Sequence, residues 1–223
     1  MAEGDNVGSR DGLRDRLGAA LYEPFLRRGE RLGLAGRRGE LLRRAHGRVV
    51  EIGAGTGLNV VHYPAAAEVV LTEPVPAMYR RLEKRVAGRT GMRPVQAPAD
   101  ALPMADASVD TVVSTLVLCT VPDVDRALAE LTRVLRPGGR LLFCEHVRAE
   151  DPKLARRQTR LAAPWAAFAQ GCRCDRDTVA LLKQRFDIED MSTARWRGMP
   201  SVVHPLIIGT ATPNRAADHH HAR

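Results

Sequence analysis

The sequence predicts an α/β fold: a doubly wound, mostly parallel sheet with helices on both faces and an antiparallel hairpin at its end. Three observations predict it. Seven short β-rich runs alternate with amphipathic helical stretches, which is typical of a parallel sheet. Residues 110–117 form a largely apolar run of the kind that fills the sheet centre. The last two β-rich runs are joined by a short loop and can only pair antiparallel.

The first half of the chain supplies three of these strands. Apolar residues at helical spacing in 13–47 predict two helical pieces. Residues 48–52 (RVVEI) predict the first strand, followed by a glycine turn at 53–57 and a helical stretch to about residue 62. The second strand is predicted over 68–72, its helix over 76–87, and a weak third strand over 93–97.

The second half supplies the other four strands. After the strand at 110–117, Asp123 is a candidate N-cap for a helix that ends at an Arg-Pro-Gly-Gly turn, residues 136–139. A fifth strand is predicted over 140–147 and a long helical region over 152–185. The hairpin is formed by the last two runs, 186–196 and 202–210.

Length and composition fit one globular domain, over 13–212. With 223 residues, 44% of them hydrophobic, the chain can bury a core without disulfides or a structural metal. No run reaches the roughly 20 apolar residues of a membrane-spanning helix, and residues 1–12 lack the apolar core of a signal peptide. We therefore expect a cytoplasmic protein with flexible ends at 1–12 and 213–223.

The net charge of +8 raises the question of whether the chain binds nucleic acid. The arginines are scattered, with only short pairs at 27–28, 37–38 and 43–44, which we interpret as solvated helix faces. We expect no nucleic-acid partner, and the oligomeric state stays open.

The four cysteines lie in or beside apolar segments without a CxxC pair, as suits a reducing compartment. Cys172 and Cys174 are one ligand pair short of a zinc site, so the sequence predicts no metal.

The glycine turn is the strongest candidate for ligand binding. Gly53, Gly55 and Gly57 allow a tight turn and a close approach of ligand to backbone. A P-loop would need Gly-Lys-Ser/Thr, and the dinucleotide fingerprint would need glycine at 58, where leucine stands. Glu73 ends the second strand, where its carboxylate can accept from both ribose hydroxyls. Glu51, inside the first strand, could orient the turn or face a cationic amine. This pattern favours S-adenosylmethionine (SAM), which has adenosine but no phosphate.

Four segments, at 49–57, 72–74, 109–113 and 135–139, give the sequence its resemblance to the class I SAM-dependent methyltransferases, with a methyltransferase type 11 domain. The resemblance implies a Rossmann-like seven-stranded sheet. It also implies an N-terminal helical cap (13–47), a SAM-binding core (48–148), a helical substrate region (149–185) and a C-terminal hairpin (186–212).

The resemblance also implies a set of cofactor contacts, and S-adenosyl-L-homocysteine as the product. The glycine turn would surround the methionyl part, Glu73 the ribose, and the adenine would lie near Pro74 and Met78. Relatives commonly have aspartate where this chain has Pro98. The implied set comprises Glu51, Gly53, Ala54, Gly55, Thr56, Gly57, Asn59, Glu73, Pro74, Met78, Ala99, Asp100, Thr115 and Leu116.

A narrower resemblance concerns the methyl acceptor. Runs at 57–59 with 63–64, 115–119, 145–147, 164–165 and 171–172 look like the branch that includes the animal alkyl-thiol S-methyltransferases. Those enzymes carry a hydrophobic N-terminal membrane anchor, which this sequence lacks. The sequence therefore predicts a small-molecule methyltransferase for a lipophilic acceptor, with an alkyl thiol as the candidate. A phospholipid or quinone methyltransferase, and a SAM-binding protein without turnover, stay open as alternatives.

Candidate acceptor-site residues follow from position. His146 ends a central strand, where open α/β sheets bind ligands, and is the candidate general base; an equal alternative is a histidine that satisfies a backbone group. A thiol with a pKa of about 8.5 needs no base, because a few per cent is already thiolate. Cys119 is expected on the pocket wall. Tyr22 and Trp165 are assigned to an apolar acceptor pocket, with core packing as the alternative.

Overall fold

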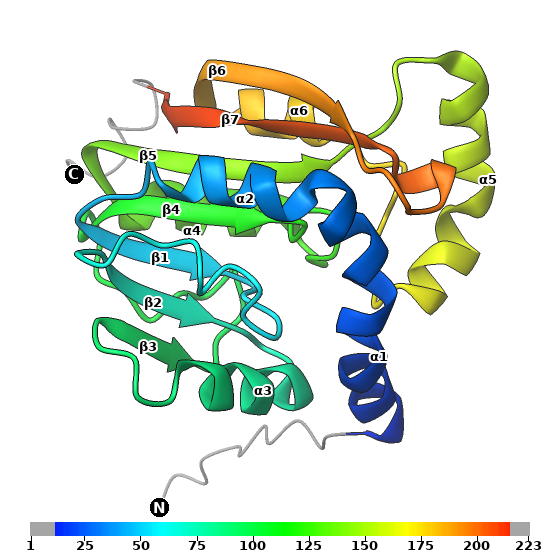
Figure 1. Ribbon diagram of the computed structural model, residues 1–223. Coiled ribbons are helices and arrows are strands. Elements are labelled where there is room, and N and C mark those ends of the chain that lie inside the picture. Colours follow the sequence, from blue (N-terminus) through cyan, green and yellow to red (C-terminus); the bar gives the residue numbers. More distant parts are fainter. Residues whose placement is uncertain (1–11, 215–223) are drawn as a thin grey trace, which may run out of the picture.

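The computed structural model describes residues 12–214, and most of the two expected flexible ends lies outside this range. Within it, one sheet has the order β3-β2-β1-β4-β5-β7-β6 (Figure 1). Neighbours from β3 to β5 pair parallel, and β7 pairs antiparallel with both β5 and β6. The predicted fold class is therefore confirmed. The strands are β1 (Arg48–Ile52), β2 (Glu68–Thr72), β3 (Met92–Val95), β4 (Val109–Thr115), β5 (Leu135–His146), β6 (Phe186–Arg195) and β7 (Pro205–Pro213).

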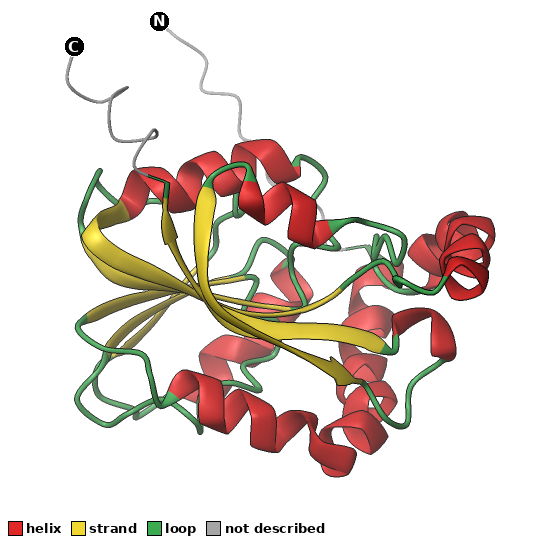
Figure 2. Ribbon diagram, turned by 90° about the horizontal axis from the view of Figure 1, so that it is seen from above, coloured by secondary structure: helices red, strands yellow, loops and turns green. Residues whose placement is uncertain are grey.

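Helices cover both faces of the sheet, which lies between two helical layers when seen from above (Figure 2). In Figure 1, α2 lies in front of the sheet and α4 behind it. None of the helices in the described range is long and apolar enough to span a bilayer. The helices are α1 (Leu13–Gly29), α2 (Ala35–Leu42), α3 (Pro76–Val86), α4 (Val124–Val134), α5 (Pro152–Phe168) and α6 (Thr178–Lys183), with a 3-10 turn at Ser201–Val203. The segment Glu30–Leu34 joins α1 to α2 through a kink at Gly33, where φ is +126°.

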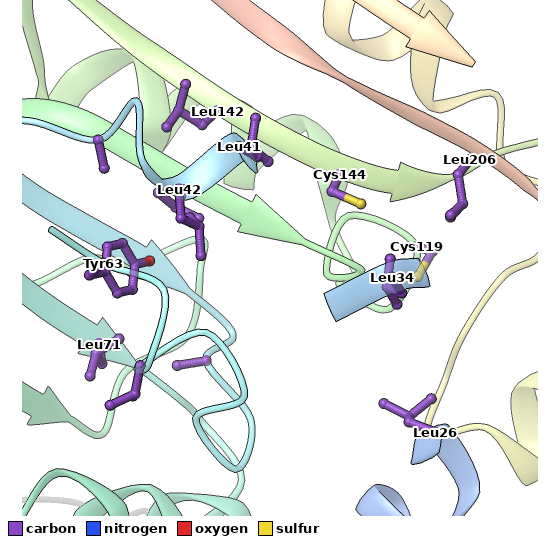
Figure 3. Close-up of a cluster of buried hydrophobic side chains, with 14 of the residues drawn as sticks. Leu26, Leu34, Leu41, Leu42, Tyr63, Leu71, Cys119, Leu142, Cys144 and Leu206 are labelled. Carbon is purple, nitrogen blue, oxygen red and sulfur yellow. The ribbon is translucent and has the colours of Figure 1, made fainter. Parts of the chain in front are cut away.

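Alternating side chains of the central strands pack against opposite helical layers. Val49 belongs to the cluster of buried side chains that includes Leu42 of α2 (Figure 3), whereas Val50 packs in the cluster of Leu128 and Leu131 from α4. Each fully buried side chain of this size stabilises the fold by about 1.5–3 kcal/mol. Burial on both faces explains why the central strands are almost continuously apolar.

The strand order reverses at β1, which pairs with β2 on one side and β4 on the other. In open α/β sheets, ligands bind beyond the carboxyl ends of the strands at such a switch point. The arrowheads of β1, β4 and β5 in Figure 1 point toward the side where α1 and α5 stand. The sheet therefore directs its binding edge toward these two helices.

The helix expected after Gly57 does not form. Residues 55–62 are a succession of turns instead, with Val60 N donating to Gly57 O and His62 N to Asn59 O. These i→i−3 bonds replace the i→i−4 bonds of an α-helix. The Asn59 side chain explains the difference, because it is held inward by buried polar groups described below.

The helical region expected over 152–185 is interrupted. α5 ends at Phe168, and Gln170 and Gly171 follow with φ of +51° and +86°, which no right-handed helix can contain. α6 begins only at Thr178. The intervening loop brings Cys172 back toward the sheet.

Two smaller differences concern β5 and β7. The Arg-Pro-Gly-Gly segment expected as a turn belongs to an irregular start of β5, where the pairing with β4 shifts register between Val109 and Thr111. β7 begins at Pro205 rather than at 202, because the residues before it form the 3-10 turn.

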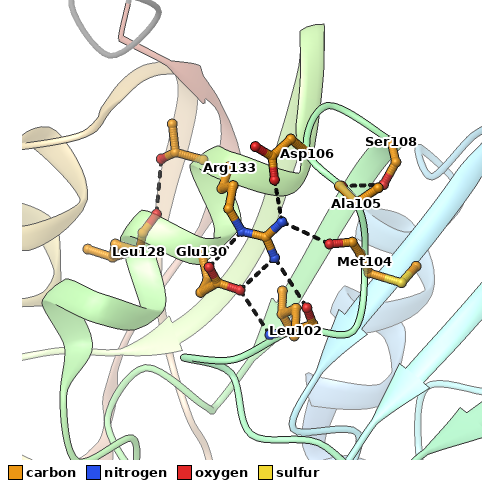
Figure 4. Close-up of polar contacts among 9 residues, drawn as sticks. Leu102, Met104, Ala105, Asp106, Ser108, Leu128, Glu130 and Arg133 are labelled. Atoms are coloured by element: carbon orange, nitrogen blue, oxygen red, sulfur yellow. Dashed lines mark hydrogen bonds and ion pairs between the residues drawn. The ribbon is translucent and has the colours of Figure 1, made fainter. Parts of the chain in front are cut away.

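The loop between β3 and β4 is fixed by Arg133 of α4 (Figure 4). Its guanidinium donates to Met104 O at 2.8 Å, to Leu102 O at 3.2 Å and to Asp106 Oδ1 at 2.6 Å. Glu130 accepts from Arg133 and from Leu102 N, and the Arg133 side chain lowers the pKa of this carboxyl. This network holds in place the segment that includes Ala99 and Asp100.

Candidate active site

The glycine turn after β1 depends on left-handed backbone. Gly53 has φ of +54°, and a Cβ added there would lie 2.8 Å from both methyl groups of Val117. Residues other than glycine rarely adopt this backbone conformation, and here their Cβ would also collide with Val117. Bare backbone therefore faces the edge where β1 and β4 end.

Glu73, the residue after β2, is bonded to this turn. Its Oε2 accepts from Gly55 N and its Oε1 from Val75 N, both at 2.8 Å. Burial raises the pKa of the carboxyl, and these two backbone N–H groups oppose the rise. Each oxygen keeps acceptor capacity, because a carboxylate oxygen has about two lone-pair sites. Glu73 thus presents a fixed acceptor pair beside the turn.

A buried polar network lies behind the turn. Asn59 Nδ2 donates to Glu51 Oε1 at 2.9 Å and contacts Thr115 Oγ1 at 2.8 Å, and Tyr63 OH donates to Glu51 Oε2 at 2.6 Å. Both Glu51 oxygens are therefore engaged by the segment that follows the turn. Of the two roles open to Glu51 from the sequence, this geometry supports orientation of the turn.

The same network contains a buried arginine, which corrects the solvated interpretation of the pair at 37–38. Arg38 of α2 is 3% exposed. Its guanidinium donates to Asn59 Oδ1 at 3.0 Å and to Thr115 Oγ1 at 3.1 Å, and pairs with Glu30 at 3.2 Å. Its neighbour Arg37 is exposed, so only one member of the pair fits the expectation.

A cavity of about 760 Å³ opens at this edge of the sheet. This volume lies within the range of about 300–1,000 Å³ usual for ligand sites. One end is lined by the glycine turn, by Glu73 and Met78, and by the loop after β3. The other end is lined by residues of α1 and α5 and of the loops after β4 and α5.

The far end of the cavity is aromatic. Phe25 of α1 packs against Phe168 of α5, with ring centroids 5.5 Å apart, and Trp165 lies 5.8 Å from Phe168 and 6.4 Å from Phe25. Tyr22, one turn before Phe25, lies instead at the end of the cavity next to the glycine turn, against Gly55. Burial, the largest cause, raises the pKa of Tyr22 to about 12. α1 and α5 thus enclose the cavity through contacts between their aromatic side chains.

Three reactive side chains meet on the cavity wall. His146 Nε2 lies 2.8 Å from Cys172 Sγ, and Trp165 Nε1 donates to the same sulfur at 3.1 Å. Cys119, His146 and Cys172 are all buried, and their ligand atoms lie within 4.8 Å of one another. The Cys119 thiol, together with His146 and Trp165, lowers the pKa of Cys172, whereas the pKa of Cys119 is raised.

The turn after β4 contains a non-glycine residue with left-handed backbone, Leu116, with φ of +60°. Leu116 N donates to Cys144 O at 2.9 Å, and the buried Glu145 carboxylate accepts from Val117 N at 3.1 Å and from Ser114 Oγ at 2.7 Å. These bonds hold the turn in a conformation that costs of the order of 1–3 kcal/mol. Such strain is typical of functional sites.

The residues expected from the sequence divide into two groups. All four acceptor-site residues, Tyr22, Cys119, His146 and Trp165, line the cavity. Among the expected cofactor residues, those on the wall are Gly53, Gly55, Glu73, Pro74, Met78, Ala99, Asp100 and Leu116. Those behind the turn, in the supporting backbone and network, are Glu51, Ala54, Thr56, Gly57, Asn59 and Thr115.

Sequence reasoning missed the buried role of Arg38, the hydrogen bond from Tyr63 to Glu51 and the meeting of Cys172 with His146. Tyr63 and Cys172 entered only through the narrower resemblance, and Cys172 also as a neighbour of Cys174, without any contact predicted for either. Nothing in the local pattern around Arg38 distinguishes it from the exposed arginine before it.

Comparison with known proteins decides the family. Residues 50–143 match the family described as "Methyltransferase domain". Thiol S-methyltransferase TMT1A of Homo sapiens is 36% identical over 141 residues, which are 61% of this chain and 58% of that protein. Demethylmenaquinone methyltransferase of Thermobifida fusca is 32% identical over 169 residues, 73% of this chain and 69% of that protein. The chain belongs to the class I SAM-dependent methyltransferases.

The chain covers only part of the length of several relatives. The chain spans 55% to 58% of the thiol S-methyltransferases that it matches. The YcgJ protein of Bacillus subtilis shares the fold, with a TM-score of 0.62 and 18% identity over 81% of this chain and 99% of that one.

The site fits the cofactor that the methyltransferase family implies. Glu73 has free acceptor capacity next to bare glycine backbone. Among residues 12–214, the cavity wall offers no lysine or arginine, so an adenosine-bearing ligand without phosphate suits this donor and acceptor set.

Proposed function

We propose that the chain transfers the methyl group of SAM to a small lipophilic acceptor, and that the acceptor is an alkyl thiol. One observation carries the proposal: a single cavity joins the Glu73 carboxylate and the glycine turn to an aromatic end formed by Phe25, Trp165 and Phe168. A polar cofactor half next to an apolar acceptor half is what transfer to a lipophilic molecule requires. The named activity of the human relative supports the thiol.

The chain's own residues bind and orient the cofactor in this proposal. Glu73 accepts from the ribose hydroxyls, Gly53 and Gly55 give the methionyl part close access to backbone, and Met78 packs against the adenine. Bound SAM supplies a methyl carbon made electrophilic by its sulfonium. The network around Glu51 keeps the turn in its binding conformation before the cofactor arrives.

The acceptor half contributes position and an apolar surface. Methyl transfer is an in-line displacement, so the protein must hold the acceptor atom on the axis of the breaking bond. Such positioning can supply about 7–11 kcal/mol of the barrier. The rings of α1 and α5 give this half an apolar wall, which is open to solvent at Phe25 and Phe168, and a thiol needs no strong base. An acceptor that does need a base would find His146 on the wall, and this role stays a prediction.

The function is tested in two steps on the purified chain. Calorimetry with SAM and with S-adenosyl-L-homocysteine measures binding. Mass spectrometry with SAM carrying a deuterated methyl group then detects product from alkyl thiols, phenols, amines and a demethylated quinone. A labelled thioether from alkyl thiols, faster than any other product, is the expected result. Binding without product across the whole panel would indicate a SAM-binding protein without turnover.

The variant Glu73→Ala tests the cofactor half. Loss of two charge-assisted hydrogen bonds, each worth about 1.5–3 kcal/mol, predicts at least a tenfold weaker SAM affinity. Isothermal calorimetry measures it. Glu68→Ala, at the exposed start of the same strand, is the matched control and should bind SAM as the parent does. Unchanged affinity in Glu73→Ala would contradict the ribose role.

Quinone methylation is the second candidate. The relative that supports it is the demethylmenaquinone methyltransferase, which is matched over 69% of its length. The aromatic end of the cavity also suits a flat ring, since aromatic pairs stack favourably. Labelled product from the demethylated quinone, with none from thiols, would favour this candidate over the first. Phospholipid methylation stays open as a further alternative, supported by the phosphatidylethanolamine N-methyltransferase of Cereibacter sphaeroides, which is 32% identical over 120 residues, 59% of that protein.

A further inference from the structure

Two cysteines and a histidine from three distant segments converge on the acceptor half of the cavity. Cys119 lies in the turn after β4, His146 ends β5, and Cys172 lies in the loop that interrupts the helical region after α5. All three line the cavity and are buried, and their ligand atoms lie within 4.8 Å of one another. This is a soft, closely spaced ligand set at the place where the acceptor is expected.

The His146 ring is not satisfied by the protein. It is 2% exposed, and its Nδ1 is buried without a hydrogen-bond partner in the described range. Its Nε2 contacts only sulfur, at 2.8 Å from Cys172 Sγ. A histidine kept for structure normally bonds a backbone carbonyl or a carboxylate. The alternative raised from the sequence, a ring that satisfies a backbone group, is therefore not what the structure shows.

The spacing suits a tetrahedral metal site. Zn–S bonds of about 2.3 Å and Zn–N bonds of about 2.0–2.1 Å place ligand atoms roughly 3.6 Å (N to S) and 3.8 Å (S to S) apart. The three ligand atoms lie within 4.8 Å of one another, and His146 Nε2 and Cys172 Sγ, now 2.8 Å apart, would have to separate by about 0.8 Å to bind one ion. Trp165 Nε1, which donates to Cys172 Sγ at 3.1 Å, would stabilise a metal-bound thiolate from the outer shell.

We propose that Cys119, His146 and Cys172 bind one Zn²⁺ through two thiolates and one imidazole, with the fourth coordination position open to the cavity. Two thiolates balance the charge of the ion, so the buried site is neutral overall. Three protein ligands with one open position are the arrangement of catalytic rather than structural zinc. Because successive ligands lie 27 and 26 residues apart along the chain, no local spacing motif predicts the site.

The open position gives the site a role that rests on the proposed thiol methylation. An acceptor thiol that displaces water there is bound as thiolate, and its proton passes to solvent. The sulfur then forms the bond to the methyl carbon as the bond between that carbon and the sulfonium breaks, with the electron pair going to S-adenosyl-L-homocysteine. The neutral thioether product is a weaker ligand than the thiolate and can leave.

The test first measures metal without reference to activity. The full chain carries three consecutive histidines at 219–221, which also bind metal, so all variants are made with these replaced by alanine. After zinc loading and removal of loose metal, elemental analysis should find about one zinc per chain. Cys119→Ser, Cys172→Ser and His146→Ala should each weaken zinc affinity by more than about 100-fold, beyond the usual effect of outer-shell changes.

The matched controls are Cys174→Ser, a buried cysteine whose sulfur lies 3.6 Å from Gln158 O, and His46→Ala, an exposed histidine. Both should keep the zinc. A further measurement needs no variant: the parent loaded with Co²⁺ should show sulfur-to-cobalt charge transfer and the intense visible bands of tetrahedral cobalt. A parent chain without zinc, or a cobalt spectrum without sulfur ligation, would overturn the site even if a ligand variant failed to fold.

Activity then separates this inference from the proposed function. Methyl transfer to thiols that persists in a zinc-free parent would overturn the role of zinc in the transfer and leave the methyltransferase assignment intact. A bound zinc without any methyl product would support the site and contradict thiol methylation. Loss of transfer upon chelation, restored by zinc, is the expected result.

Discussion

Glu51 shows at the scale of one residue how the site is maintained. Its side chain is 1% exposed and both oxygens accept hydrogen bonds. Burial raises the pKa of this carboxyl from 4.5 to about 7, although the bonds from Tyr63 and Asn59 and the charge of Arg38 oppose the rise. The glycine turn is thus held by a carboxyl group whose ionisation is costly in the folded state.

The pH dependence of stability follows from that shift. Because the folded pKa lies above the unfolded one, Glu51 costs no stability below about pH 4.5, and the cost grows until about pH 7. The shift corresponds to about 3 kcal/mol. Glu51→Gln cannot ionise, so its unfolding free energy should match the parent at pH 4.5 and exceed it by up to about 3 kcal/mol at pH 8.

Urea unfolding at the two pH values measures this difference. Glu68→Gln, at the exposed start of β2, is the control and should follow the parent at both. An equal offset between Glu51→Gln and the parent at both pH values would contradict the assigned ionisation.

At the scale of elements, two glycine-bearing segments use left-handed backbone for different purposes. Gly53 joins β1 to the turn, and its missing Cβ leaves room for Val117 of the neighbouring connection. Gly138 lies at the irregular start of β5 with φ of +80° and open space around it. Glycine is therefore needed at position 53 both for its left-handed backbone and for the packing of Val117, and at position 138 for the left-handed backbone alone.

Alanine at each position separates the two effects. Gly138→Ala should destabilise the chain by about 1–2 kcal/mol, the cost of a left-handed L-residue. Gly53→Ala should lose a further 1–3 kcal/mol or so from overpacking against Val117, and SAM affinity with it. Urea unfolding and calorimetry measure the two quantities. Equal losses of stability in both variants would show that Val117 moves aside freely.

At the scale of the whole molecule, Arg38 joins the N-terminal helices to the centre of the sheet. It bonds Thr115 at the end of β4 and Asn59 in the segment after the glycine turn, and it pairs with Glu30. α1, which encloses the cavity through Phe25, precedes this link along the chain. Arg38 therefore ties Glu30, the residue that follows α1, to the end of β4 beside the cavity.

Replacement of that charge tests the link. Arg38→Met leaves Glu30 without its partner and should cost about 3–5 kcal/mol, as does breaking a buried ion pair. Adding Glu30→Gln should recover part of the loss, because the uncompensated carboxylate is then removed. Arg37→Met, at the exposed neighbouring position, should change stability by less than about 0.5 kcal/mol. Thermal or urea unfolding of the parent and the three variants measures these changes in stability. An equal loss of unfolding free energy for the substitutions at positions 37 and 38 would contradict the link.

The sequence by itself determined the order of the strands, the terminal hairpin, the glycine turn after β1 and the carboxylate after β2. Each of these features is predicted from residues that lie close together in the sequence. Burial on one face or both sets the hydrophobic period of a strand or helix, and a left-handed turn selects glycine at the position concerned.

Only the tertiary structure decided which polar side chains meet. Arg38 and Thr115 are 77 residues apart, and His146 and Cys172 are 26 apart, so no period or spacing links them. The break at Gln170, which returns Cys172 to the sheet, also lacks a strong local signal. The physical reason is that a long-range contact depends on how whole elements pack, whereas a sequence pattern records only the burial of each position.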